Sequence, residues 1–202
     1  MQIEARNKAT LIHPITSILE RLDTDKLFPV SQPLEVELGA GDGSFLVQHA
    51  RLHPAHNFIG VERLLGRLRK IDKKGLRLGL GNLRLMRIEA AYFLEFLLPE
   101  KSVVALHVYF ADPWPKRKHR KNRLVNESFT VLAQKVLRPE GTVYLRTDDA
   151  DYFEQMTRVF DADPAFEKTL VPETLLAVVT DFERNFHLRG VPTLAAAYRL
   201  VI

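Results

Sequence analysis

Cysteine is absent from this 202-residue chain, so disulfide bonds, thiolate zinc sites and cysteine nucleophiles are excluded. Long apolar runs are also missing, since none approaches the ~18 residues of a membrane-spanning helix. No signal-peptide pattern opens the chain, so we expect a cytoplasmic protein that does not enter a membrane. The seven histidines show no HExxH-type pairing, and we therefore expect no metal ion. His53 and His56 flank a Pro-Ala turn, which predicts surface positions.

Positive charge is concentrated in two stretches of the chain. The formal net charge is +4, and 46% of the residues are hydrophobic, which is enough for one domain over residues 1–202. One stretch places six Lys or Arg side chains among the eight residues 116–123, called the basic run below. The other comprises Arg63, Arg67, Arg69, Lys70, Lys73, Lys74 and Arg77. Such clusters favour an anionic partner such as a nucleic-acid backbone, and the alternative is an ordinary solvated face.

Strand-like and helix-like segments alternate from Leu34 onward, with short turns between them. This order predicts an α/β fold with a mostly parallel sheet and helices on both faces. Apolar helical periods mark three of the helices. The predicted strands are 34–38, 58–61, 83–87, 103–110 and 141–146, and these helices are 45–52, 124–137 and 149–160.

The two ends of the chain differ from this regular order. Residues 174–182 and 194–202 are rich in β-forming residues and are joined by a turn at Gly190-Val191-Pro192, which predicts a C-terminal antiparallel strand pair. One helix is predicted over 14–22. Pro29 and Pro33 mark its linker to the sheet, so residues 1–33 are expected to form an N-terminal helical extension of the single domain.

Asp112-Pro113-Trp114-Pro115, the proline elbow, directly follows the predicted strand 103–110. Each proline biases the preceding residue toward extended backbone, so Asp112 and Trp114 are predicted to be held in a stiff ribbon. A carboxylate and an aromatic face are thereby presented together at the end of a strand. The basic run follows at once, and this arrangement predicts a catalytic lip beside a phosphate track.

A glycine-rich loop is predicted where the first strand turns into the first helix. Gly39, Gly41 and Gly43 allow positive φ and close approach of a ligand, and ligands of open α/β sheets bind at this edge. Ser44 occupies the position of the third glycine of a dinucleotide fingerprint. Glu37, just before the loop, would repel a pyrophosphate but suits a cationic ligand such as S-adenosylmethionine.

Two more acids follow the next two predicted strands. Glu62 lies about 20 residues beyond the loop, where an acid accepts the hydroxyls of a ribose. Its alternative is an exposed strand-end charge. Glu89 follows the third strand, where a side chain that contacts adenine is expected.

Together these motifs resemble the bacterial tRNA (guanine-N7)-methyltransferase family of Class I S-adenosylmethionine-dependent methyltransferases, over residues 34–192. The basic run with its proline elbow is the most specific motif, whereas the glycine loop is shared with many methyltransferases. The motifs are Glu37-Leu-Gly-Ala-Gly-Asp-Gly43, Gly60-Val61-Glu62, Asp112-Pro-Trp-Pro-Lys-Arg-Lys-His-Arg-Lys-Asn-Arg123, Thr147-Asp148 and Thr180-Asp-Phe-Glu183, followed by Phe186, Gly190 and Pro192.

The resemblance implies a Rossmann-like Class I methyltransferase fold and 7-methylguanosine in the variable loop of tRNA as the product. It implies a monomer or homodimer whose partner is tRNA. Asp112 is implied as the catalytic residue. The implied cofactor contacts are Glu37, Gly39, Gly41, Gly43, Glu62, Glu89 and Asp112. The implied tRNA contacts are Lys116, Asp148, Thr180, Asp181, Phe182 and Glu183, with weaker phosphate contacts from Arg117, Lys118, Arg120, Lys121 and Arg123.

The sequence departs from the family pattern in two places. Glu89 stands where an aspartate is frequent, and residues 161–179 are short and lack an Asp-Leu-His segment. The first departure leaves the expected cofactor site largely intact, while the second bears on the details of tRNA recognition.

Guanine N7 carries a free lone pair, so its methylation needs no general base. Attack on the methyl carbon puts positive charge on the purine, and the expected role of Asp112 is to position and stabilise that charge. Trp114 either stacks on a base or covers the end of the sheet. Asp148 and Glu183 would act as hydrogen-bond acceptors for base or sugar donors.

Three other functions remain open from the sequence. An amino-methyltransferase acting on adenine or cytosine also carries an Asp/Asn-Pro elbow, although its second proline usually follows directly. A nicotinamide-dependent oxidoreductase is disfavoured by Ser44 and by the antiparallel tail. A non-catalytic RNA-binding module would keep the fold without turnover, but every expected cofactor-facing acid is present.

Overall fold

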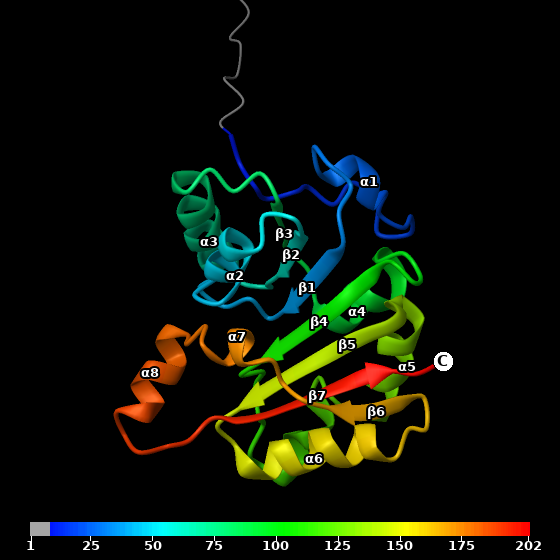
Figure 1. Ribbon diagram of the computed structural model, residues 1–202, viewed down its shortest axis with the longest axis vertical. Helices are drawn as coiled ribbons and strands as arrows, with labels where there is room; N and C mark the ends of the chain where they lie inside the picture. The colour runs from blue at the N-terminus through cyan, green and yellow to red at the C-terminus, as the bar shows by residue number, and fades with distance from the viewer. Residues whose placement is uncertain (1–8) are drawn as a thin grey trace, which may run out of the picture.

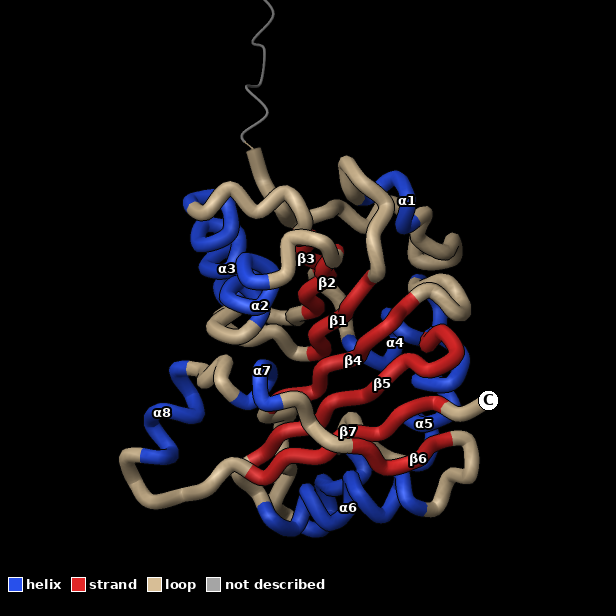
Figure 2. The backbone as a smooth tube through the Cα atoms, in the orientation of Figure 1, coloured by secondary structure: helices blue, strands red, loops and turns tan. Residues whose placement is uncertain are grey.

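A seven-stranded sheet organises the computed structural model, which describes residues 9–202 (Figures 1 and 2). The strand order is β3-β2-β1-β4-β5-β7-β6; the first five strands in the sequence run parallel, and β7 runs antiparallel to both β5 and β6. The prediction of a mostly parallel sheet with an antiparallel C-terminal pair is confirmed. The strands are β1 Leu34–Leu38, β2 Asn57–Val61, β3 Leu83–Met86, β4 Val103–Tyr109, β5 Leu137–Thr147, β6 Phe166–Thr169 and β7 Leu194–Leu200.

Helices cover both faces of this sheet, as predicted (Figure 1). The apolar residues of α2 and α3 pack on one face of β2 and β3, and α7 continues that layer across β4 and β5. On the other face η1, α5 and α6 pack on the larger core. The helices are α1 Thr24–Leu27, α2 Leu46–Leu52, α3 Leu65–Arg77, α4 Ala90–Tyr92, α5 Glu127–Val136, α6 Ala150–Asp161, α7 Glu173–Leu176 and α8 Asp181–His187, with a π-helical η1 Phe93–Leu97 and a 3₁₀-helical η2 Arg117–Asn122.

The central strands bury polar residues on one face, the face covered by α2 and α7. Successive side chains of a strand point to opposite faces. In β1 the apolar residues Leu34, Val36 and Leu38 therefore enter the larger core, while Glu35 and Glu37 point to the opposite face and are also buried. The carboxyl ends of β1, β4 and β5 point toward α7 and α8 (Figure 1). This edge is where a site is expected in an open α/β sheet.

The C-terminal strand pair forms from a different segment than predicted. The partner of β7 is β6, Phe166–Thr169, and the predicted strand 174–182 instead forms α7 and the start of α8. Thr180 begins α8 with a capping box, because its side chain accepts from Glu183 N and Glu183 accepts from Thr180 N. Only the first residue of β6 is buried, so this edge strand carries little apolar pattern.

The predicted helix over residues 14–22 is wrong. This segment is irregular, and the only helix between residues 9 and 33 is the single turn α1. It is held by contacts to other elements: Leu22 N donates to Leu97 O at 2.8 Å, and Tyr92 Oη donates to Ile18 O at 2.9 Å. Ile18 and Leu19 are exposed, so the segment lacks the buried apolar face that stabilises a helix.

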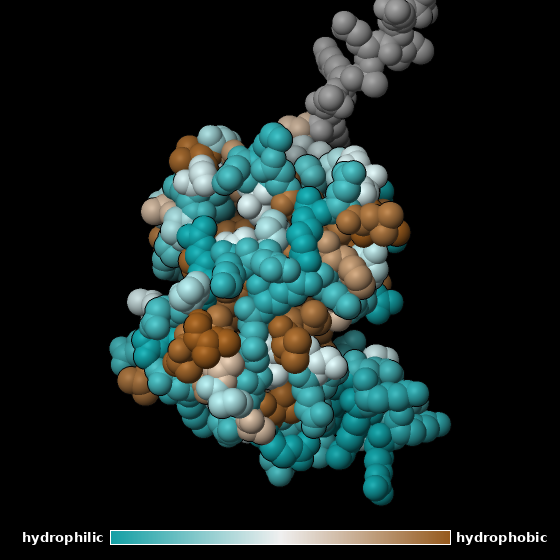
Figure 3. Space-filling view, turned by 90° about the vertical axis from the view of Figure 1, so that its right-hand side faces the viewer, coloured by the Kyte–Doolittle hydropathy of each residue, from teal (hydrophilic) through white to brown (hydrophobic). Residues whose placement is uncertain are grey.

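The surface carries scattered apolar side chains. Seen from the right-hand side of Figure 1, the molecule is mostly hydrophilic with separate hydrophobic patches (Figure 3). Isolated exposed apolar residues are normal for folded proteins. Over residues 9–202, no helix combines the length and the hydrophobicity that crossing a membrane demands.

Candidate functional site

The loop after β1 curls over the end of β2. Gly39, Gly41 and Gly43 all have left-handed backbone, with φ of 81°, 56° and 75°. Gly41 N donates to Glu62 Oε2 at 3.1 Å, so the loop is tied to the acid that ends β2. A Cβ at Gly43 would lie 2.8 Å from the Ile71 side chain, so this glycine allows close packing on α3.

A cavity of about 290 Å³ opens onto Glu37. Glu37 is buried, and among the described residues its Oε2 has no hydrogen-bond partner. Burial raises the pKa of the Glu37 carboxyl to about 8; Asp42 and Glu62 add to the rise, while Arg146 opposes it. A buried polar atom without a partner is costly. A cationic group bound in the cavity would supply the missing partner.

A second cavity, of about 750 Å³, adjoins the first. Glu62 and Glu89 line it, and both also hold local structure. Glu62 accepts from Leu64 N at 2.7 Å as well as from Gly41 N, and Glu89 caps α4 by accepting from Tyr92 N at 2.8 Å. A carboxylate has about four lone-pair sites, so each acid keeps acceptor capacity for a ligand.

Asp112 lies where the two cavities meet. It is exposed and lines both of them, together with Gly39, Arg67 and Phe110. The structure thus gathers the predicted cofactor residues around one continuous space, except that Gly43 supports the loop from behind. These residues are Glu37, Gly39, Gly41, Glu62, Glu89 and Asp112.

The proline elbow is bent where an extended ribbon was predicted. Trp114 has a φ of 44°, in the left-handed region, and Phe110 just after β4 has a φ of 51°. The prediction of extended backbone at Trp114 is therefore wrong. Left-handed backbone at bulky residues stores strain and persists where the surroundings enforce it. The Trp114 ring is half-buried, lines the second cavity and meets the His119 ring edge-on at 5.9 Å.

The basic run divides into exposed and buried cations. Lys116, Arg117, Lys118 and Lys121 are exposed, and Arg120 is partly engaged, since its Nη2 lies 2.9 Å from Asp151 Oδ1. Arg123 is different. Its guanidinium is buried against the Tyr152 ring and donates to Pro113 O, Gln155 Oε1 and Asp151 Oδ2. The expectation that Arg123 contacts phosphate is therefore corrected, because Arg123 braces the proline elbow.

The residues of segment 180–183 also differ in whether they line a cavity or are buried in the fold. Thr180, Asp181 and Phe182 line the first cavity, and the Phe182 ring lies 5.6 Å from the ring of Phe110. Glu183 is only 3% exposed and pairs with Arg146 at 3.3 Å besides closing the capping box. The expectation that Glu183 accepts hydrogen bonds from RNA is corrected for this reason. Asp148, half-buried after β5, lies outside both cavities.

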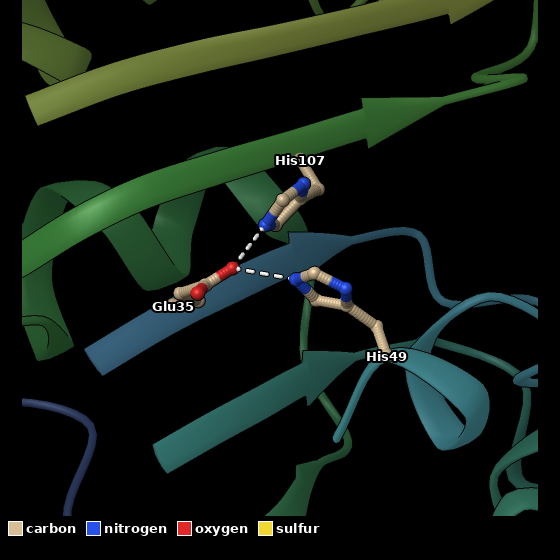
Figure 4. Close-up of side chains that lie close together, drawn as sticks. All are labelled: Glu35, His49 and His107. Atoms are coloured by element: carbon tan, nitrogen blue, oxygen red, sulfur yellow. Dashed lines mark hydrogen bonds and ion pairs between the residues drawn. The ribbon is translucent and has the colours of Figure 1, made fainter. Parts of the chain in front are cut away.

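Sequence reasoning missed a buried group that we call the inner cluster: Glu35, His49, His53, His56 and His107. Glu35 Oε2 lies 3.0 Å from His49 Nε2 and 2.7 Å from His107 Nε2, as Figure 4 shows. Glu35 Oε1 lies 2.6 Å from His56 Nδ1, so half-buried His56 and His53 are not simple surface residues. The available signal was the alternation of acids and apolar residues in Leu34–Leu38.

Charge within the inner cluster is fixed by these contacts. Burial favours a higher pKa for Glu35, but hydrogen bonds from His107 and His49 outweigh it and hold that pKa well below its usual range. Burial lowers the pKa of His107 despite the neighbouring Glu35. An ionised carboxylate beside a neutral His107 imidazole follows. Three of these side chains, Glu35, His49 and His107, place potential metal-ligand atoms within 4.8 Å of one another.

The chain is similar to known methyltransferases in sequence and in structure. A family model described as "Putative methyltransferase" matches residues 31–196. The tRNA (guanine-N(7)-)-methyltransferase of Chromohalobacter salexigens is 37% identical over 154 residues, which cover 76% of this chain and 63% of that protein. The tRNA (guanine-N(7)-)-methyltransferase of Alkalilimnicola ehrlichii is 34% identical over 173 residues, which cover 84% of this chain and 71% of that protein. The match to the first relative thus spans less than two thirds of its length.

Solved structures agree on the fold. The 16S rRNA methyltransferase KamB superposes with a TM-score of 0.64 at 18% identity, covering 90% of this chain and 95% of that chain. At this level of identity the likeness concerns the architecture alone.

Proposed function

Since the chain belongs to the tRNA (guanine-N7)-methyltransferase family, we propose that it transfers a methyl group from S-adenosylmethionine to N7 of a guanosine in tRNA. The observation that carries the proposal is the placement of Asp112 at the junction of two adjoining cavities, one of which ends on the unpartnered Glu37. The variable loop of tRNA is the proposed position of the guanosine, and the cytoplasm is the proposed location.

The residues around the cavities fit the proposed cofactor. S-adenosylmethionine supplies an electrophilic methyl group on a sulfonium, together with an ammonium group and a ribose. Glu37 would pair with the ammonium, which gives its unpartnered oxygen a charged hydrogen-bond donor. Glu62 would accept from the ribose hydroxyls, and Glu89, on the rim of the second cavity, would lie toward the adenine. Gly39 and Gly41 leave open space where a side chain would intrude.

Asp112 would act on the guanine rather than on the cofactor alone. Guanine N7 needs no deprotonation, so the catalytic requirement is alignment of N7 and stabilisation of the positive charge that develops on the purine. The Asp112 carboxylate is exposed at the junction of the cavities, where it can face both ligands. The hydrogen bond from Arg123 to Pro113 O would hold the proline elbow in place against the strain at Phe110 and Trp114.

The tRNA would lie across the exposed cations and the aromatic rim. Lys116, Arg117, Lys118 and Lys121 are available for phosphate contacts, with Arg120 as a weaker contributor because of Asp151. Asp181 and the exposed ring of Phe182 line the first cavity, where the ring offers a stacking surface for a base. Thr180, which also lines this cavity, and Asp148, which lies outside it, remain proposed tRNA contacts.

The proposal is tested by incubating the protein with unmodified tRNA and radiolabelled S-adenosylmethionine, followed by digestion to nucleosides. We expect label in 7-methylguanosine. Asp112→Ala should lower kcat by at least about 100-fold while the Kd for the cofactor changes by less than about threefold. Asp23→Ala, at an exposed aspartate paired with Lys26, serves as the matched control. Label in a methylated exocyclic amine would overturn the base assignment, and equal loss of kcat and cofactor affinity would overturn the role given to Asp112.

A further inference from the structure

Four of the seven histidines gather around one buried carboxylate. Glu35 is contacted by His49, His56 and His107 at 2.6–3.0 Å, and the His53 ring lies 4.2 Å from that of His49. Neither cavity is lined by any of these residues, so the proposed methyl transfer does not use them. A grouping of this density around a single acid calls for a role of its own.

Three of the side chains converge on one point from separate elements. Glu35 comes from β1, His49 from α2 and His107 from β4 (Figure 4). Their residues are 6%, 3% and 1% exposed. Their atoms Oε2, Nε2 and Nε2 lie within 4.8 Å of one another. Ligand atoms around a tetrahedral zinc ion are separated by about 3.3 Å. The distances of 2.7 and 3.0 Å from Glu35 Oε2 reach that separation with shifts of a few tenths of an ångström, and the two imidazole nitrogens lie within 4.8 Å of each other.

We propose that Glu35, His49 and His107 form a binding site for a divalent transition-metal ion of the zinc type. Two imidazoles and one carboxylate are a common set of protein ligands for zinc, whereas calcium and magnesium prefer oxygen ligands alone. The surroundings provide outer contacts for two of the three ligands, while the buried His49 Nδ1 has no partner among the described residues. His107 Nδ1 lies 2.9 Å from Tyr109 Oη, and the second oxygen of Glu35 is held by His56. His56 is half-buried, so the cluster reaches the protein surface at its ring.

The ion would link residues on both sides of the glycine loop. Glu35 precedes and His49 follows the glycine loop, and His107 lies five residues before Asp112 on the adjoining strand. A bond network joining these three residues would restrain both ends of the loop and the start of the proline elbow. This inference extends beyond the proposed methyl transfer and does not depend on it, because the metal would bind whether or not the chain is a methyltransferase.

The test is zinc binding to the untagged full-length protein. The protein is treated with a chelator, dialysed and titrated with Zn²⁺, with bound metal measured by mass spectrometry and Tm by calorimetry. We expect one equivalent of zinc per chain and a rise in Tm of several degrees at saturating zinc. Co²⁺ in place of Zn²⁺ should give the visible absorption of a four-coordinate nitrogen and oxygen site.

Variants assign the binding to this cluster. His49→Gln keeps an N–H donor for Glu35 but lacks an imidazole ligand, so zinc affinity should fall at least tenfold. His187→Gln, at an exposed histidine near Thr193, is the matched control and should bind zinc as the wild type does. Substoichiometric zinc with unchanged Tm in the wild type would overturn the proposal without any variant. So would zinc binding that His187→Gln removes and His49→Gln leaves intact.

Discussion

Two glutamates that lie two residues apart on β1 differ in their hydrogen-bond partners and in the direction of their pKa shifts. Glu35 and Glu37 point to the same face of the same strand, and both are buried. Glu35 is surrounded by three imidazoles, and its pKa lies well below the usual range. Glu37 keeps an oxygen without a partner among the described residues, and burial raises its pKa to about 8. In the metal-free protein the first carboxylate has protein partners for both oxygens, while the second keeps an oxygen available for the cofactor.

The cations of the basic run show the same division. Arg123 is buried with three hydrogen-bond acceptors, whereas Lys118 and Lys121, two to five residues earlier, are exposed. Residue type and proximity in the sequence therefore do not separate structural charges from binding charges. What separates them is the number of hydrogen-bond and ion-pair partners that the fold supplies. A buried charge without partners is unstable unless a ligand provides one.

Removing the satisfied glutamate should have the largest effect. Glu35→Ala deletes the acceptor shared by three histidines, and leaving the buried donors of His49 and His107 unsatisfied costs about 1–3 kcal/mol each, or roughly 2–6 kcal/mol together. We expect a free energy of unfolding lower by that amount in urea titrations of the metal-free protein. Glu37→Ala is the neighbouring control. If the two variants lose equal stability, the contrast between the two glutamates is broken.

Arg123→Ala should come next. It removes three hydrogen bonds and a cation–π contact beneath the proline elbow, and we expect a loss of about 2–4 kcal/mol in the free energy of unfolding. Lys121→Ala should leave that free energy within about 0.5 kcal/mol, because it is a surface substitution. Its effect should instead be on tRNA binding, where the slope of log K against log salt falls by about 0.7–0.9 for one lost phosphate contact. An Arg123→Ala protein of unchanged stability would contradict the assigned bracing role.

Glu37→Gln should separate binding from stability. We expect the cofactor Kd to rise about 10- to 100-fold, which corresponds to about 1.4–2.7 kcal/mol, in isothermal titration calorimetry. Stability should not fall. The pKa of Glu37 is raised in the folded chain from 4.5 to about 8, so its ionisation lowers wild-type stability as the pH rises from 4.5 to 8. The amide removes that loss, so Tm at pH 8 should equal or exceed that of the wild type. A lower Tm would show that Glu37, like Glu35, stabilises the fold.

The smallest expected effect is the number of protons released when the cofactor binds. At pH 7 a pKa of about 8 leaves about nine in ten Glu37 carboxyls protonated. Pairing with the cofactor ammonium lowers that pKa, so binding should release close to one proton. Calorimetry at pH 7 in two buffers of different ionisation enthalpy measures this number. Glu37→Gln should reduce the release to near zero, and a wild-type release near zero would contradict the change of protonation assigned to Glu37.

Much of the candidate site was accessible from the chain alone. Glycine spacing and strand ends located the loop, Glu37, Glu62, Glu89 and Asp112, because parallel strands present their carboxyl ends at one edge. The errors concern segments whose local pattern admits two structures. Residues 174–182 form β-prone runs, yet the Thr180–Glu183 capping box and the buried Arg146 pair hold a helix there. Trp114 takes a left-handed backbone that two flanking prolines do not indicate.

Periodicity and turn chemistry act within a few residues, and they were enough to predict the α/β class, the strand positions of β1 to β4 and the edge of the sheet where the cavities open. The hydrogen-bond and ion-pair partners of a charged side chain come from distant parts of the sequence, so they could not be predicted in this way. The three residues that converge on Glu35 are 14, 21 and 72 positions away, and the partners of Arg123 lie up to 32 positions away. Whether a charged side chain is satisfied or available depends on contacts that exist only after the strands and helices have packed.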